Sequence, residues 1–184
     1  MVRHALVLLS GGLDSMACIY YYINQGFDVK ASFIDYGQKA EKNEYLSASA
    51  ISSYFGVSLE KLSFKSLNKF GLGEHKGRNA FLIFAAILSN PGVEGLISMG
   101  IHATTNYYDC SELFEKEINR LLCGYFDGTV IFSAPFIKWS KKMIYMYCKE
   151  NCLPIDLTYS CEEGNDIPCG ECCSCLDRRA LNVR

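Results

Sequence analysis

The sequence predicts an α/β protein with a doubly wound, five-stranded parallel sheet and a C-terminal zinc-binding tail. Short apolar runs alternate with stretches of helical periodicity from residue 4 to about residue 150. The first run, Ala5–Leu9, has five apolar residues in a row, as expected of a strand buried on both faces of a parallel sheet. Repeated strand–helix units of this size place helices on both faces of one sheet.

The strand predictions rest on runs that combine strand length with β-branched or aromatic residues. After the first run, these are VKASFID, SLEKLSF, EGLISMGI and TVIFSAPF. The predicted strands are Ala5–Leu9, Val29–Asp35, Ser58–Phe64, Glu94–Ile101 and Thr129–Phe136.

Helices are predicted between the strands and after the last one. Apolar residues recur at helical spacing from Leu13 onward, and Ser140 is placed to cap the last helix. A glycine-rich loop, Ser66–Gly77, precedes the third helix. The predicted helices begin at Leu13 and then cover about Lys39–Phe55, Arg78–Asn90, about Ser111–Cys123, and Ser140 to about Glu150.

The composition is that of a globular protein with one core. The 184 residues are 49% apolar and 21% charged, and the formal net charge of −2 offers no general attraction to polynucleotides. No apolar run reaches the length of a membrane span, and the first run is too short for a signal peptide. We therefore expect a cytoplasmic protein without a membrane partner.

The segment Ser10–Ser15, SGGLDS, interrupts the pattern where the first strand ends and the first helix begins. Free backbone N–H groups and the positive end of the helix dipole make such a junction an anion site. The segment matches neither the Walker nor the dinucleotide glycine pattern. Two hydroxyls and several N–H groups without a lysine suit a diphosphate. The alternative is that the glycines only relieve backbone strain at a turn.

Four polar segments follow strands or precede helices on what should be one rim of the sheet. In doubly wound sheets, ligands bind beyond the carboxyl ends of the strands. We therefore expect one ligand site formed by Ser10–Ser15, Asp35–Gln38, Lys76–Asn79 and His102–Cys110.

Cysteines are concentrated at the C-terminal end, where six of the ten lie in the last 33 residues. Four of them form the pattern C-x7-C-x2-C-x2-C, and four thiolates close a tetrahedral zinc site with no open position. Cys173 adjoins a ligand and should point away. Reactive or disulfide-forming cysteines are the alternative. We predict one structural zinc ion on Cys161, Cys169, Cys172 and Cys175, in a tail of residues 158–184 packed on a domain of residues 1–157.

The SGGLDS segment resembles the PP-loop of the N-type ATP pyrophosphatases, a superfamily with a HUP-like fold. The resemblance implies that ATP is cleaved to AMP and pyrophosphate when a substrate oxygen attacks the α-phosphorus. It also implies that Ser10, Gly11, Gly12 and Ser15 hold the pyrophosphate and that Asp14 organises the loop or a Mg²⁺ ion.

The chain as a whole resembles the QueC family of 7-cyano-7-deazaguanine synthases. The matching segments are DYGQK (35–39), GRN (77–79), YYDC (107–110) and TYSC…PCGECCSCLDR (158–178). The resemblance implies a homodimeric enzyme of queuosine biosynthesis with a structural zinc. The enzyme adenylates 7-carboxy-7-deazaguanine, joins it to ammonia, and uses a second ATP to convert the amide into the nitrile.

The resemblance implies functional roles for three groups of residues. The catalytic residues would be Asp14, Ser15 and Arg78. The ATP-binding residues would be Leu9, Ser10, Gly11, Gly12, Leu13, Asp14, Ser15, Tyr36, Gly37 and Gln38. The substrate-binding residues would be Lys39, Arg78, Asn79, His102, Tyr108 and Asp109.

The sequence departs from the family pattern at the substrate side. Lys39-Ala40 replace an Arg-His pair, and Lys76 replaces a proline. The segment HATTNYYDCS lacks the Asp-Ser-Gly element and has Ser111 in place of an arginine. One alternative is therefore a paralogue of the antiviral-defence type, which couples the activated deazaguanine to an amine of a protein or nucleic acid.

Two further classes remain open. A tRNA-modifying thiolase needs a reactive cysteine near the loop, whereas Cys18 faces the wrong way on helical phase and Cys110 occupies the family's own position. A non-catalytic nucleotide-binding subunit is disfavoured by the intact SGGLDS segment.

Overall fold

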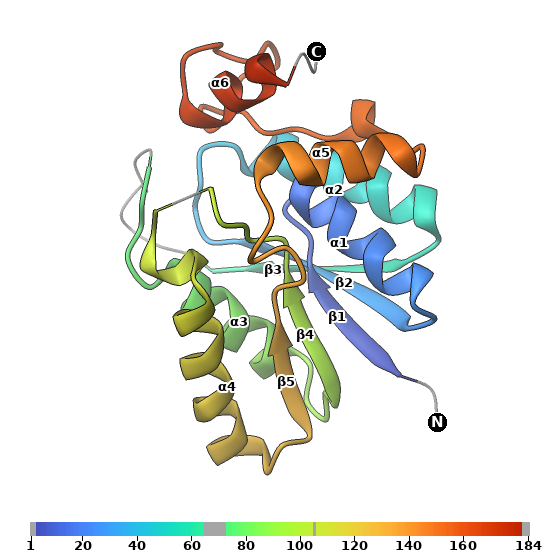
Figure 1. Cartoon of the computed structure of the whole chain (residues 1–184), viewed down its shortest axis with the longest axis vertical. Coiled ribbons are helices and arrows are strands. Elements are labelled where there is room, and N and C mark those ends of the chain that lie inside the picture. The colour runs from blue at the N-terminus through green and yellow to red at the C-terminus, as the bar shows by residue number, and fades with distance from the viewer. Residues whose placement is uncertain (1–2, 65–72, 105, 182–184) are drawn as a thin grey trace.

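The computed structural model describes residues 3–64, 73–104 and 106–181, so most of the predicted loop at residues 66–77 lies outside the described residues. Within them, five parallel strands form one sheet in the order β3-β2-β1-β4-β5 (Figure 1). This confirms the predicted fold class. The strands are β1 (His4–Leu8), β2 (Asp28–Asp35), β3 (Ser58–Ser63), β4 (Gly95–Met99) and β5 (Val130–Ser133).

The helices lie close to their predicted places. They are α1 (Leu13–Asn24), α2 (Glu41–Phe55), α3 (Arg78–Ser89), α4 (Glu112–Phe126), α5 (Lys141–Glu150) and α6 (Cys173–Ala180), with short 3-10 turns η1 (Tyr108–Cys110) and η2 (Ile155–Leu157). The Ser140 hydroxyl accepts a hydrogen bond from Met143 N, as the capping prediction required.

Several boundaries differ from the predicted ones for local reasons. Strand β5 ends before Pro135, whose nitrogen has no hydrogen to donate to a ladder. Strand β4 ends before Gly100, where an added Cβ would lie 2.4 Å from Asp14 O, so the chain passes too close to α1 for a side chain. Helix α4 begins after Ser111, its N-cap, and runs three residues further than predicted. Helix α6 was not predicted.

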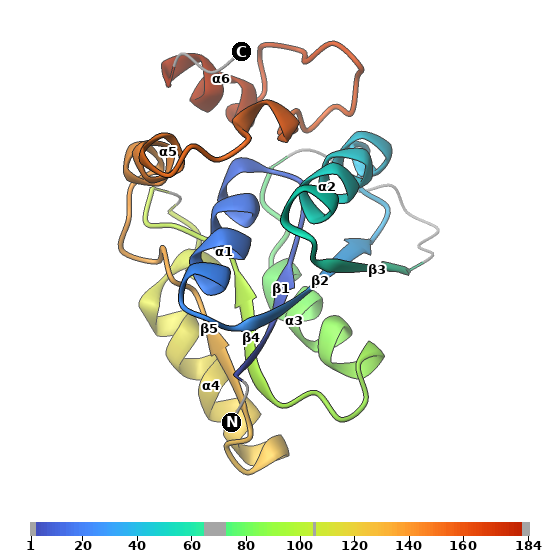
Figure 2. The ribbon, with the colours of Figure 1, turned by 90° about the vertical axis from the view of Figure 1, so that its right-hand side faces the viewer.

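The helices cover both faces of the sheet (Figures 1 and 2). One core cluster joins α1, α2 and α5 to alternate strand residues such as Val7 and Phe33. A second cluster joins α3 and α4 to the intervening residues, such as Leu8 and Ile34. Burial on both faces explains why the first strand is continuously apolar. None of the helices in the described part of the chain has the length and hydropathy that a bilayer crossing requires.

The strand order reverses beside β1, because the chain adds β2 and β3 on one side and β4 and β5 on the other. Ligands of doubly wound proteins bind at such a reversal, beyond the carboxyl ends of the strands. The C-terminal tail with α6 lies over this end of the sheet (Figure 2). The fold therefore brings the tail and the first loop of the chain to the same place.

Candidate functional site

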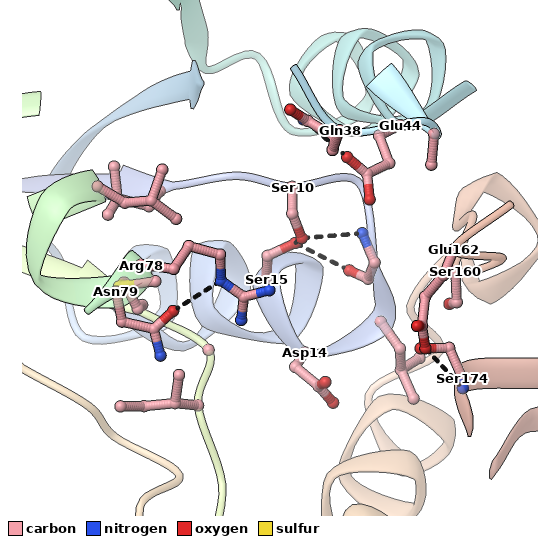
Figure 3. A pocket seen from close by; sticks show the side chains of 18 of the residues that line it. Ser10, Asp14, Ser15, Gln38, Glu44, Arg78, Asn79, Ser160, Glu162 and Ser174 are labelled. Atoms are coloured by element: carbon pink, nitrogen blue, oxygen red, sulfur yellow. Dashed lines mark hydrogen bonds between the residues drawn. The ribbon is translucent and has the colours of Figure 1, made fainter. Parts of the chain in front are cut away.

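A cavity of about 410 Å³ opens at the carboxyl ends of the strands. Each of the four segments predicted to form the rim contributes to its wall, and so does the tail. Figure 3 labels residues of the first three segments and of the tail. The lining includes Ser10, Asp14 and Ser15; Tyr36 and Gln38; Arg78 and Asn79; His102 and Cys110; and, from the tail, Tyr159, Ser160, Glu162, Cys173, Ser174, Asp177 and Arg178. Of the ATP-binding residues predicted from the sequence, Leu9, Gly12 and Leu13 also line it, whereas Gly11 and Gly37 do not.

The SGGLDS loop is held tightly between α1 and α2. Gly11 has φ +84°, and a Cβ there would lie 2.4 Å from Glu44 O, so only glycine fits without movement. Tyr159 N of the tail donates to Gly11 O at 3.0 Å. The Ser10 and Ser15 hydroxyls lie 3.2 Å apart, and Ser15 Oγ donates to Gly12 O at 3.0 Å. Because no described side chain caps α1, its first N–H groups remain available to an anion.

Asp14 lies at the centre of a charged group that the sequence did not reveal. Its Oδ2 atom forms an ion pair with Lys141 Nζ and lies 3.7 Å from His102 Nε2. Its Oδ1 atom is buried and has no hydrogen-bond partner among the described residues. Lys141 is in the first turn of α5, where the helix dipole disfavours a cation. That position, directly after a serine cap, is the sequence signal that could have identified this lysine as part of a site.

His102 is mostly buried in the same group. Burial lowers the pKa of His102; Asp14 opposes this shift and Lys141 adds to it. Thr104 N donates to Nδ1 at 3.3 Å, which places the proton of the neutral ring on Nε2, facing Asp14. His102 therefore presents a neutral N–H donor to the cavity.

Arg78 begins α3 and points into the cavity (Figure 3). Its Nε donates to Asn79 Oδ1 at 3.3 Å. Asn79 is buried, and its Nδ2 donates to Asp109 O at 3.1 Å, which ties the start of α3 to η1. Asp109 thus lies behind the wall of the cavity. Tyr108, also predicted to contact the substrate, is 58% exposed, stacks edge-on against Phe114 and does not line the cavity.

Gln38 links the second rim segment to a carboxyl group that the sequence analysis missed. Its Oε1 accepts from Tyr36 N at 2.9 Å, and its Nε2 donates to Glu44 Oε2 at 3.0 Å. Burial raises the pKa of Glu44, against the effect of that hydrogen bond. The neighbouring Lys39 also lines the cavity, but its ammonium group pairs with Glu163 of the tail at 3.1 Å.

The tail closes one side of the cavity and is fastened to α2. Asn43 Nδ2 donates to Gly164 O at 2.9 Å, and a Cβ on Gly164 would lie 2.4 Å from Lys39 O. Glu162 accepts from the hydroxyl of Ser174 at 3.0 Å and from its backbone N–H at 3.3 Å. The tail is therefore part of the site as well as a candidate metal centre.

The four predicted cysteine ligands, termed here the four-cysteine cluster, lie together. Their sulfur atoms are all within 4.8 Å of one another. Cys169 N donates to Cys161 Sγ at 3.3 Å and Cys172 N donates to Cys169 Sγ at 3.4 Å, an arrangement that stabilises thiolates. Four thiolates at this spacing fit a tetrahedral zinc ion. Cys173 is exposed and lines the cavity, so it points away from the cluster as predicted.

Similarity to known proteins identifies the family of this chain. The family profile described as "Queuosine biosynthesis protein QueC" matches residues 4–74 and 76–182. The chain belongs to the QueC family. Two similar relatives are named 7-cyano-7-deazaguanine synthase. The one from Thermoplasma volcanium is 32% identical over 95% of this chain and 84% of its own length. The one from Acetivibrio thermocellus is 30% identical over 96% of this chain and 91% of its own length.

Solved structures support the fold of this QueC-family chain. The U34-tRNA thiolase NcsA from Methanococcus maripaludis, solved with its [4Fe-4S] cluster, has a TM-score of 0.55 at 16% identity. The match covers 98% of this chain and 64% of that one. NMN synthetase from Francisella tularensis has a TM-score of 0.52 at 13% identity, and the match covers 99% of this chain and 73% of that one. At these identities the similarity concerns the fold alone.

Proposed function

We propose that this QueC-family protein is an ATP-dependent enzyme that adenylates 7-carboxy-7-deazaguanine and joins it to ammonia, giving the amide and then 7-cyano-7-deazaguanine. The observation that carries this proposal is the meeting of the SGGLDS loop, Arg78 and Lys141 in one cavity. Anion-binding N–H groups and two cations around one space are what a phosphoryl-group reaction with a carboxylate substrate requires.

In the first step, a carboxylate oxygen of the acid attacks the α-phosphorus of ATP and pyrophosphate leaves. The N–H groups at the start of α1 and the hydroxyls of Ser10 and Ser15 would hold the pyrophosphate. Lys141 and Arg78 would stabilise the charge that spreads over the phosphoryl oxygens. Mg²⁺ bound with ATP would neutralise part of that charge, and Asp14, with its unpaired Oδ1 atom, suits it as a ligand.

In the following steps, ammonia attacks the acyl carbon, AMP leaves and a proton is lost, giving the amide. The amide oxygen then attacks the α-phosphorus of a second ATP, pyrophosphate leaves, and one of the two N–H protons is lost, giving a neutral imidate adenylate. Loss of AMP and a proton from this adenylate forms the carbon–nitrogen triple bond. Both activations have the same phosphoryl geometry, so one set of residues serves them, and the four-cysteine cluster contributes by holding the tail in place.

A thiolase activity that uses Cys18 or Cys110 as its nucleophile is disfavoured by the burial of these two side chains. Burial raises the pKa of Cys18 to about 12, and this side chain lies in the core against Ser98 at 3.2 Å. Burial also raises the pKa of Cys110, which lines the cavity, to about 11. Neither thiol ionises readily enough to act as a nucleophile near neutral pH.

A second candidate is the attachment of the activated deazaguanine to a larger amine of a protein or nucleic acid. The alignment with the Thermoplasma volcanium relative runs over 204 positions, more than the 184 residues of this chain, so the relative carries residues that this chain lacks. Ser111, which stands where the family has an arginine, caps α4 by accepting from Phe114 N. The segment HATTNYYDCS, which lacks the family's Asp-Ser-Gly element, borders the cavity at His102, Tyr107 and Cys110. A smaller enclosure at this border would favour a bulkier acceptor.

One reaction mixture separates these proposals. The protein is incubated with the acid, ATP, Mg²⁺ and ammonium, and the products are followed by mass spectrometry. AMP, pyrophosphate and the nitrile, without ADP, support the synthase. AMP without nitrile, together with deazaguanine mass on a macromolecule, supports the second candidate. No AMP with this acid contradicts both.

Arg78→Ala should abolish AMP release in this mixture, whereas Arg120→Ala, an exposed arginine on α4, should leave it unchanged. The family resemblance also leads us to propose a homodimer, which light scattering on the purified protein tests directly.

A further inference from the structure

Two buried side-chain polar atoms lack a hydrogen-bond partner within the described residues, and both belong to residues that line the cavity. One is Asp14 Oδ1, discussed above. The other is the hydroxyl of Ser32, which is only 1% exposed. A buried hydroxyl without a partner destabilises a fold, so its position on a cavity wall points to a ligand that supplies the missing bond.

Ser32 lies in the middle of β2, between partner strands β1 and β3. It pairs in register with Leu8 of β1, and its carbonyl accepts from Leu9 N at 2.9 Å. Leu8 pairs in turn with Met99 of β4. Residues paired across strands share a face of the sheet, so Ser32, Leu8 and Met99 form one row on the side covered by α3.

This row forms an apolar part of the cavity wall. Leu8, Ile34 and Met99 belong to the core cluster under α3 and also line the cavity, as does Leu82 of α3. On this wall the Ser32 hydroxyl therefore accompanies the apolar side chains of Leu8, Leu82 and Met99. Such a wall does not suit a phosphate, which needs several donors or a cation. It suits the edge of a flat heterocyclic base, which buries apolar faces and offers both donors and acceptors.

We propose that the Ser32 hydroxyl forms a hydrogen bond to the base of a purine-type ligand and thereby contributes to base selection. The inference rests on the proposed function for the identity of the ligand, since that reaction uses two such bases: the adenine of ATP and the deazaguanine acid. Both present nitrogen and oxygen atoms at a planar edge, which a hydroxyl can pair with as donor or acceptor.

Ser98 provides a matched control in the same sheet. It is also fully buried, but its hydroxyl donates to Ser133 O at 2.6 Å and lies 3.1 Å from the Tyr22 hydroxyl. Ser98 does not line the cavity. Removing the Ser98 hydroxyl therefore breaks existing bonds, whereas removing the Ser32 hydroxyl breaks none among the residues that the structure describes.

The test compares Ser32→Ala, Ser98→Ala and the unmodified full chain. Thermal unfolding is measured without ligand, and binding of ATP and of the acid is measured separately by calorimetry. We expect Ser32→Ala to unfold at an equal or higher temperature and to bind one of the two ligands about three- to tenfold more weakly. Ser98→Ala should unfold at a lower temperature with both affinities unchanged.

The two ligands distinguish the sources of the base. Weaker ATP binding assigns Ser32 to adenine, and the variant should then also lose preference for ATP over purine riboside triphosphate. Weaker binding of the acid assigns it to the deazaguanine. Unchanged affinity for both ligands, a fall in unfolding temperature like that of Ser98→Ala, or failure of the unmodified chain to bind either ligand overturns the inference. A different result contradicts the proposed function but leaves this inference standing. In that case the unmodified chain binds ATP more tightly than Ser32→Ala does, yet forms no product from the acid.

Discussion

Replacing Lys141 by methionine should reduce both the stability and the activity of the protein. Lys141 and Asp14 form a mostly buried ion pair, with side chains 19% and 18% exposed. Without the lysine, the Asp14 carboxylate keeps His102, at 3.7 Å, as its one ion-pair partner among the described residues. Removing one partner of a fully buried pair costs about 3–5 kcal/mol. Because both side chains retain some contact with water, we expect a loss of about 2–3 kcal/mol here.

For a domain of this size, that loss lowers the unfolding temperature by about 4–12 °C. The rate of AMP release should fall by about 10²–10³, because a single donor aimed at the charge that develops in the transition state contributes about that factor to the rate. The double variant Lys141→Met/Asp14→Asn leaves no buried charge unpaired. It should regain most of the stability while AMP release stays low.

Thermal unfolding measures the stability of each variant, and AMP release measures its activity. Lys142→Met is the control, because Lys142 is the next residue of the same helix and is exposed. If Lys141→Met behaves like Lys142→Met in both assays, the pair contributes neither stability nor catalysis. If the double variant recovers AMP release, Lys141 acts only by neutralising Asp14.

Three further predictions follow from other parts of the structure. Cys169→Ser should lose bound zinc and solubility while Cys173→Ser keeps both, and equal zinc contents in elemental analysis would contradict the four-cysteine cluster. Because burial lowers the pKa of His102, the folded protein binds fewer protons at this residue than the unfolded chain does. The contribution of His102 to the free energy of unfolding should therefore be fully present above its ordinary pKa of 6.5 and should be lost as the pH falls toward the lowered pKa of the folded state. His102→Asn should flatten that decline in urea unfolding between about pH 7.5 and 5, and parallel curves for the two proteins would rule this out. Gly11→Ala should destabilise the protein by about 1–3 kcal/mol more than Gly12→Ala, since a Cβ would lie 2.4 Å from a backbone oxygen at the first position and 3.6 Å from the nearest atom at the second; equal urea midpoints would contradict the tight loop.

The sequence by itself determined the sheet, the position of the SGGLDS loop and the membership of the four-cysteine cluster. Each of these depends on neighbours along the chain. Strand burial appears as a continuous apolar run, a strand-to-helix junction needs glycine at a left-handed position, and metal ligands need short fixed spacings. The parallel order then requires the loops that follow the strands to share one edge, which is why each of the four predicted rim segments contributes residues to one cavity.

Only the tertiary structure decided which side chains from distant segments meet. Lys141 and Asp14 are 127 residues apart, and no local pattern connects them. Asp109 is directed behind Asn79, and Tyr108 outward, by the packing of η1 against α3 and α4. The missing partner of Ser32 is equally invisible in the sequence, because whether a buried hydroxyl is satisfied depends on every segment that packs around it. The geometry of the backbone fixes which residues can be neighbours when they are only a few positions apart in the sequence. Contacts between distant segments depend instead on how the whole core packs.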